Sequence, residues 1–103
     1  MNRSVIRIVK MTFHPDRIAD FLELFDGRSS YIRSFDGCER LDLVRDTRFS
    51  NIMTTISIWA SEDALAAYRE SEVFNETWAI TKEMFANRPE AASYVQIRNV
   101  EPL

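Results

Sequence analysis

The sequence has very few of the residues that hold metals or cross-link small proteins. Its 103 residues include one cysteine, Cys38, and one histidine, His14. A disulfide needs a pair of cysteines, and a structural zinc site takes about four Cys or His ligands. A single chain therefore cannot form a disulfide framework, and we expect no structural metal.

Glycine and proline, which are common in linkers, are also scarce, and neither sign of charge is in large excess. The chain has 2 glycines and 3 prolines, with 13 basic against 16 acidic residues and a formal net charge of -3. The basic residues are scattered along the chain, so there is no electrostatic footprint for nucleic acid. A length of 103 residues with 46% apolar residues suits one domain over 1–103 with one core.

Long apolar runs are missing as well. No run approaches the roughly 20 residues that a membrane-spanning helix needs. The first residues, Met1 to Ser4, lead into a strand-like segment without the apolar core of a signal peptide. We expect a cytoplasmic protein without a membrane partner.

The hydrophobic periodicity predicts alternating strands and helices. Strands are indicated by period-two patterns, and helices by apolar residues at helical spacing after good capping residues. Ser61 and Ser71 are both candidate N-caps, so the later helical region is predicted to be two pieces. The expected elements are strand 5–13, a helix from Pro15 to the turn at 35–37, strand 38–45, strand 52–59, helical pieces 62–69 and 72–86, and strand 92–100.

This order defines a fold class. Two strand-helix-strand halves in succession give an α+β, ferredoxin-like βαββαβ fold with a four-stranded antiparallel sheet and its helices on one face. Gly27 interrupts the first helix and predicts a kink or a close backbone approach there.

The second face of this sheet is also apolar in the sequence. Ile6 and Ile8 share one face of the first strand, and Ile52, Ile56 and Ile58 share one face of the third. An apolar sheet face of that extent usually marks an interface. We expect a homodimer in which two such sheets pack face to face into a barrel with the helices outside.

A stretch at the junction of the third strand and the second helical region carries a family resemblance. The strand ends at Trp59, an acidic helix start and a small-residue stretch follow, and Ser71 and Phe74 form a Ser-x-x-Phe. With the Gly37-Cys38 turn, this pattern resembles the antibiotic biosynthesis monooxygenase family of dimeric α+β barrels. Ala64 and Leu65 also match that pattern.

Two departures from the family pattern bear on chemistry. Many members have a histidine where this chain has Tyr68, and another where it has Val73. The heme-degrading branch of the superfamily uses a first-strand Asn and a helix His, at positions that align with Val9 and Trp78 here. The resemblance therefore disfavours heme degradation.

The resemblance implies a monooxygenase that needs no metal, flavin or heme, because an electron-rich quinol or anthrone can itself reduce dioxygen once deprotonated. Trp59, Tyr68 and His14 are the candidate catalytic residues. Either tryptophan indole N–H is a candidate donor to a developing oxyanion. The candidate substrate-binding residues, in a pocket between sheet and helices, are Phe21, Phe25, Phe74 and Trp78.

Plainer interpretations remain open for the same residues. Trp59 also suits a plug between sheet and helix, and Trp78 suits a core stripe. Cys38 suits a buried small hydrophobe better than a nucleophile. The alternative function is a non-catalytic small-ligand-binding or stress-response dimer of the same fold, and the sequence leaves open which sheet face Trp59 occupies.

Overall fold

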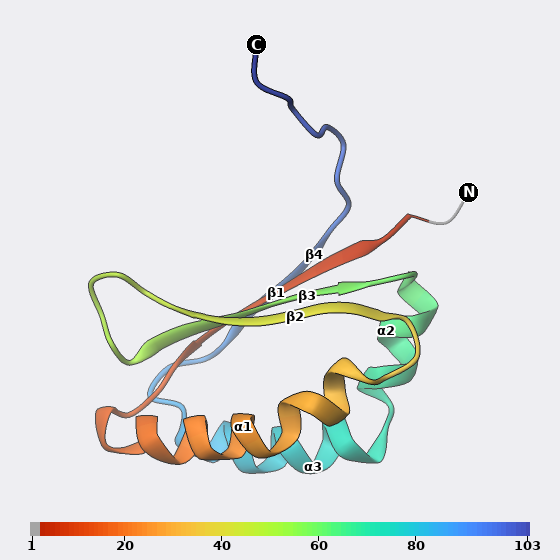
Figure 1. Cartoon of the computed structure of the whole chain (residues 1–103). Helices are drawn as coiled ribbons and strands as arrows, with labels where there is room; N and C mark the ends of the chain where they lie inside the picture. Colours follow the sequence, from red (N-terminus) through yellow and green to blue (C-terminus); the bar gives the residue numbers. More distant parts are fainter. Residues whose placement is uncertain (1–2) are drawn as a thin grey trace.

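The computed structural model describes residues 3–103, which form one antiparallel sheet with the helices packed on one of its faces (Figure 1). This confirms the α+β, ferredoxin-like fold. In chain order the elements are β1 (Val5–Thr12), η1 (Pro15–Arg17), α1 (Ile18–Arg33), β2 (Cys38–Arg45), β3 (Ile52–Trp59), α2 (Glu62–Arg69), α3 (Glu72–Thr81), η2 (Lys82–Met84) and β4 (Glu90–Tyr94).

The sheet has the strand order β2-β3-β1-β4, with every neighbouring pair antiparallel. β1 is a central strand and pairs along its whole length with β3, from Val5 opposite Trp59 to Thr12 opposite Ile52. Because directly opposed residues project to the same side, this register fixes which side chains share a face.

The predicted helix starts are confirmed by their caps. The Ser61 hydroxyl accepts a hydrogen bond from the Ala64 N–H at 3.1 Å, and the Ser71 hydroxyl accepts one from the Phe74 N–H at 3.2 Å. Each cap satisfies an N–H group that the first helical turn leaves without a partner. The second helical region is therefore two helices, α2 and α3, as predicted.

The prediction for the last strand was wrong in its bounds. β4 covers Glu90–Tyr94 instead of 92–100, and the residues after it leave the sheet as an extended tail (Figure 1). β4 pairs only with β1, and that pairing ends with Ile6 opposite Tyr94. Since β1 begins at Val5, which would stand opposite Val95, the residues after Val95 have no β1 residue left to pair with.

The close backbone approach was predicted at the wrong glycine. Gly27 lies inside α1, and a Cβ there would meet nothing within 4 Å. Gly37 instead has a φ of 86°, and a Cβ on it would stand 2.5 Å from the Ala64 Cβ. Gly37 therefore allows both the turn before β2 and the close seating of α2.

The buried side chains form two clusters between the sheet and the helices. One lies around Met11, Phe13, Phe21, Met53 and Met84, and the other around Val5, Cys38, Trp59 and Leu65. Trp59 is 1% exposed and projects toward the helices, like Val5 opposite it. This settles the face that the sequence left open.

The other sheet face has no helix over it within the described chain (Figure 1). There Ile6 pairs with Ile58 and Ile8 with Ile56, and all four side chains are half-buried. The centre of this face is therefore apolar, as predicted, and the ion pairs Lys10–Glu90 and Arg40–Asp42 flank it. None of the helices within residues 3–103 is both long and apolar enough to cross a membrane.

Candidate ligand cavity

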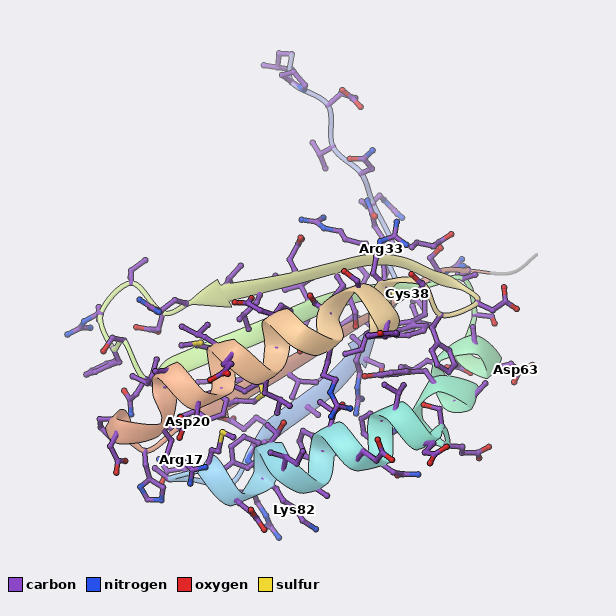
Figure 2. All side chains as sticks on the ribbon, turned by 60° about the horizontal axis from the view of Figure 1, so that its bottom comes forward. Arg17, Asp20, Arg33, Cys38, Asp63 and Lys82 are labelled. Atoms are coloured by element: carbon purple, nitrogen blue, oxygen red, sulfur yellow. The ribbon has the colours of Figure 1, made fainter. Side chains whose placement is uncertain are left out.

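A cavity of about 300 Å³ lies between the helix-facing side of the sheet and the helices. It touches both buried clusters, since Met11 and Phe21 line it from one and Trp59 and Leu65 from the other. Its volume is at the low end of the range for ligand pockets, about 300–1,000 Å³. Figure 2 shows the side chains that project from the helices and the sheet into this layer.

The structure brings most of the predicted site residues together at this cavity. Six of them line it: Phe21, Phe25, Trp59, Tyr68, Phe74 and Trp78. Their roles in binding or catalysis stay predictions. His14 is not in the wall, because it is exposed at the start of η1, where its backbone N–H donates to the Met84 carbonyl at 3.0 Å.

A continuous series of aromatic contacts runs along the wall from Trp59 at the end of β3 to Trp78 in α3. Tyr68 stacks on Trp59, with ring centroids 4.8 Å apart and planes at 20°. It also meets Phe74 edge to face at 5.2 Å, and Phe74 stacks on Trp78 at 5.9 Å. Such pairs are favourable beyond their buried area and hold the rings in fixed orientations. The cavity therefore presents ordered aromatic surfaces to a ligand.

The indole N–H of Trp59 is already used. It donates to the Ser57 hydroxyl oxygen at 3.0 Å, inside the buried layer. To donate to a ligand oxyanion, this indole would have to give up its bond to Ser57, so that role stays a prediction. Ser57 lines the cavity too, and its own hydroxyl hydrogen remains available to a ligand.

Tyr68 is suited to donating a hydrogen bond and not to accepting a proton. Burial, with a smaller contribution from Cys38, raises the pKa of Tyr68 to about 12. Near neutral pH the phenol therefore keeps its proton. A tyrosine in this state can donate to an anionic oxygen but is a poor general base.

One buried hydroxyl of the wall lacks a partner. Thr77 lines the cavity, and its Oγ1 is buried with no hydrogen-bond partner in the described part of the chain. Its neighbour Thr81 is satisfied, because its hydroxyl donates to the Thr77 carbonyl at 2.7 Å. A buried polar atom without a partner costs about 1–3 kcal/mol, so the Thr77 hydroxyl is poised for a ligand.

Two arginines of the wall were missed by sequence reasoning. Arg7 projects from the centre of the sheet and donates from Nη1 to the Ser93 hydroxyl at 3.0 Å. Arg69 lines the cavity from the last turn of α2. Burial, and next the nearby Arg69 charge, lower the pKa of Arg7. The available signal was a charged residue among Val5, Val9 and Met11, on the otherwise apolar helix-facing side of the central strand.

The described part of the chain places no Asp, Glu or His in the cavity wall. Across residues 3–103, no three His, Cys, Asp or Glu side chains gather closely enough to hold a metal ion. Cys38 is a free, buried thiol outside the cavity wall, and burial is the main cause that raises its pKa. Its carbonyl accepts a hydrogen bond from Arg33 at the end of α1 (Figure 2). The interpretation of Cys38 as a buried small hydrophobe is confirmed.

Sequence comparison identifies the family. The model of the antibiotic biosynthesis monooxygenase (ABM) family matches residues 4–79. The chain therefore belongs to the ABM family. It is also 32% identical over 78 residues, 76% of its length, to a protein of Natronomonas pharaonis named in provisional terms as heme-binding. The chain spans only 13% of that much longer relative.

Solved structures share the fold at low sequence identity. A Caulobacter crescentus protein, described provisionally as an antibiotic biosynthesis monooxygenase, superposes with a TM-score of 0.88 at 17% identity, covering 94% of this chain and 92% of that one. A point mutant of SnoaB, a cofactor-independent oxygenase from Streptomyces nogalater, gives a TM-score of 0.85 at 17% identity, with 97% and 99% covered. These likenesses establish the fold.

Proposed function

We propose that this chain is a monooxygenase that oxidises a small aromatic or quinol-like substrate in the cavity without a cofactor. The observation that carries the proposal is the cavity itself, with its aromatic wall and the unpartnered Thr77 hydroxyl. Family membership and the fold shared with a cofactor-independent oxygenase support the same reaction class.

In this reaction the substrate supplies all the electrons. An activated ring CH₂ becomes C=O, one oxygen atom of O₂ enters the product, and the other leaves with the two hydrogens as water. The chain's part is to exclude water, to stack the ring against Trp59 or Trp78, and to donate hydrogen bonds to the substrate oxygen. The hydroxyls of Thr77, Tyr68 and Ser57 are the donors that we assign to this task.

The heme named for the Natronomonas relative does not fit these residues. Heme iron takes His, Cys, Met or Tyr as axial ligand. His14 and Cys38 lie outside the wall, and the raised pKa of Tyr68 opposes the phenolate that would ligate iron. Met11 is the remaining candidate in the wall, and a cavity of about 300 Å³ is small for a macrocycle. The proposal therefore includes no heme.

The direct test is oxygen consumption with an anthrone and a naphthoquinol, using protein stripped of metal by a chelator. We expect faster oxidation than without protein, and a decrease of about tenfold for Trp59→Phe, which removes the ordered indole. Tyr31→Phe is the matched control, since Tyr31 is 69% exposed on α1. A rate equal to the protein-free rate with both substrates would contradict the proposed activity.

The second candidate function is a non-catalytic small-ligand-binding or stress-response dimer. The specific observation in its favour is that residues 3–103 supply no Asp, Glu or His to the cavity wall, together with the raised pKa of Tyr68. Such a protein would bind the anthrone or quinol and protect it from oxygen. Binding accompanied by a rate below the protein-free rate would select this function.

We also propose that the chain acts as a homodimer through the open sheet face. The half-buried isoleucines Ile6, Ile8, Ile56 and Ile58 form an aliphatic patch that a second copy related by a two-fold axis would cover. Light scattering after size-exclusion chromatography should give twice the mass of the 12.0 kDa chain. A monomer at all concentrations tested would rule this arrangement out.

Two smaller expectations complete the proposal. The first strand pairs with the last one, so all four strands between residues 5 and 94 belong to one sheet, which supports a single domain over 1–103. A cytoplasmic location is proposed from the sequence, and the free buried thiol of Cys38 is compatible with it.

A further inference from the structure

We propose that the cavity selects an aromatic anion, whose carboxylate or phenolate oxygen is bound by Arg7 and Arg69 while its ring packs on the aromatic wall. This inference rests on the proposed function, because it names the ligand class of the same cavity.

The charge of the cavity wall is the first argument. Among the described residues, Arg7 and Arg69 are the only charged ones in the wall, since no Asp, Glu or Lys lines it and Tyr68 stays protonated. Neither arginine takes part in an ion pair within residues 3–103, where four pairs join other side chains: Lys10 with Glu90, Arg17 with Asp20, Arg28 with Glu76, and Arg40 with Asp42. An anionic ligand would provide the counter-charge that the chain does not supply.

The burial of Arg7 makes this missing counter-charge costly. The guanidinium is partly removed from water, and its charge is close enough to Arg69 for the two to repel. Like charges repel, and the repulsion is stronger where burial weakens the screening by water. An anion between them would attract both guanidinium groups and so offset their repulsion. A neutral ligand would leave the repulsion in place.

The two arginines differ in how firmly they are held. Arg7 sits on central strand β1 and is oriented by its hydrogen bond to Ser93, which leaves other guanidinium N–H groups free. Arg69 is exposed at the end of α2, where a cation also interacts well with the helix dipole. Arg7 is thus held by a side-chain hydrogen bond, whereas Arg69 is exposed to solvent.

This arrangement also explains how chemistry can proceed without a base in the wall. Nearby positive charges lower the pKa of a phenol or enol, because they favour its ionised form. The same two arginines that bind the anion would therefore favour ionisation of a weakly acidic substrate, which releases its proton to solvent water as it binds. The deprotonated form is the one that can pass electrons to dioxygen.

The test compares matched probes by isothermal titration calorimetry. Naphthoate and naphthamide have the same ring system and differ in charge. We expect naphthoate to bind at least about tenfold more tightly, a difference of about 1.4 kcal/mol, and to lose this advantage at high salt. Arg7→Met and Arg69→Met should each weaken naphthoate binding about tenfold and leave naphthamide binding unchanged. Arg98→Met in the tail is the control.

A second arm separates the two anion chemistries. Naphthol titrated with and without protein reports the pKa of the bound phenol. A downward shift that Arg7→Met removes identifies phenolate recognition, whereas charge-dependent naphthoate binding without this shift identifies carboxylate recognition. Either result supports the proposal.

The failures are distinguishable. Equal affinity for naphthoate and naphthamide, with naphthol unshifted, would overturn the anion preference and leave the proposed aromatic cavity intact. If folded wild-type protein binds none of the three probes, the proposed function fails as well. Because the Arg7 side chain is partly buried, the folding of Arg7→Met is checked by thermal melting. Arg69→Met changes an exposed side chain, so its result stands if Arg7→Met does not fold.

Discussion

The two faces of the sheet are formed by the same strands but carry different kinds of side chain. Toward the helices, β1 presents Val5, Arg7, Val9 and Met11, and β3 adds a threonine, a serine and a tryptophan. On the open side the centre of both strands is isoleucine. A surface that mixes apolar and polar groups suits a ligand of defined shape. An aliphatic patch flanked by the ion pairs Lys10–Glu90 and Arg40–Asp42 suits another sheet.

The largest expected effect is on the helix face. Trp59→Ala removes a side chain that is 1% exposed, so we expect a loss of about 3–5 kcal/mol in the free energy of unfolding. Urea unfolding followed by circular dichroism measures it. Tyr31→Ala on α1 should change stability by less than about 0.5 kcal/mol. Equal effects for the two variants would mean that Trp59 is not packed as described.

The next largest effect is expected on the open face, where a substitution should disrupt dimerisation. Ile56→Glu places a charge in the proposed interface and should weaken dimerisation by about a hundredfold, or nearly 3 kcal/mol. Analytical ultracentrifugation over a dilution series measures this change. Tyr31→Glu adds the same charge on α1 and should leave the dimer unchanged. Dimerisation of Ile56→Glu at wild-type strength would move the interface elsewhere.

A pH titration of stability probes the helix-facing side through Tyr68, without a substitution in the core. The tyrosine of the unfolded chain ionises near 10, and Tyr68 in the folded chain has a pKa of about 12. Between these values the folded chain holds a proton that the unfolded chain releases. The free energy of unfolding should therefore fall by about 2–3 kcal/mol as the pH rises from about 10 to 12.

Comparison with Tyr68→Phe isolates this contribution. The variant should lack the decline that Tyr68 causes, while Tyr31→Phe should keep it because Tyr31 is exposed. Parallel curves for wild type and Tyr68→Phe would show that the Tyr68 hydroxyl is solvated.

The smallest effect concerns a single oxygen atom. Thr77→Val removes the unpartnered hydroxyl and keeps the shape of the side chain, so stability should rise by about 1 kcal/mol. Binding of naphthol should weaken at the same time, if Thr77 donates to the ligand. Thr54→Val on the open face has no such orphan to remove and serves as the control. A loss of stability in Thr77→Val would indicate a partner for the hydroxyl.

The sequence predicted the elements better than the cavity chemistry. Local signals such as the caps Ser61 and Ser71 act within one turn, and they predicted the helix starts correctly. The face of Trp59 depends on register with β1, which is a long-range property. The end of β4 depends on where β1 begins. The sequence could show that Arg7 is unusual in a central strand. Only the packed structure shows that Arg7 and Arg69 line the same cavity.

The break between α2 and α3 has a consequence for the shape of the cavity. In one unbroken helix, Tyr68 and Phe74 would point about 120° apart around the axis, at ~100° per residue. Because Ser71 caps a new helix between them, the two rings instead meet edge to face at 5.2 Å. Ser71 is not in the cavity wall, yet it bends that wall inward. A substitution of Ser71 that fused the two helices would separate the rings of Tyr68 and Phe74. The cavity wall would then change shape although no residue lining it had been substituted.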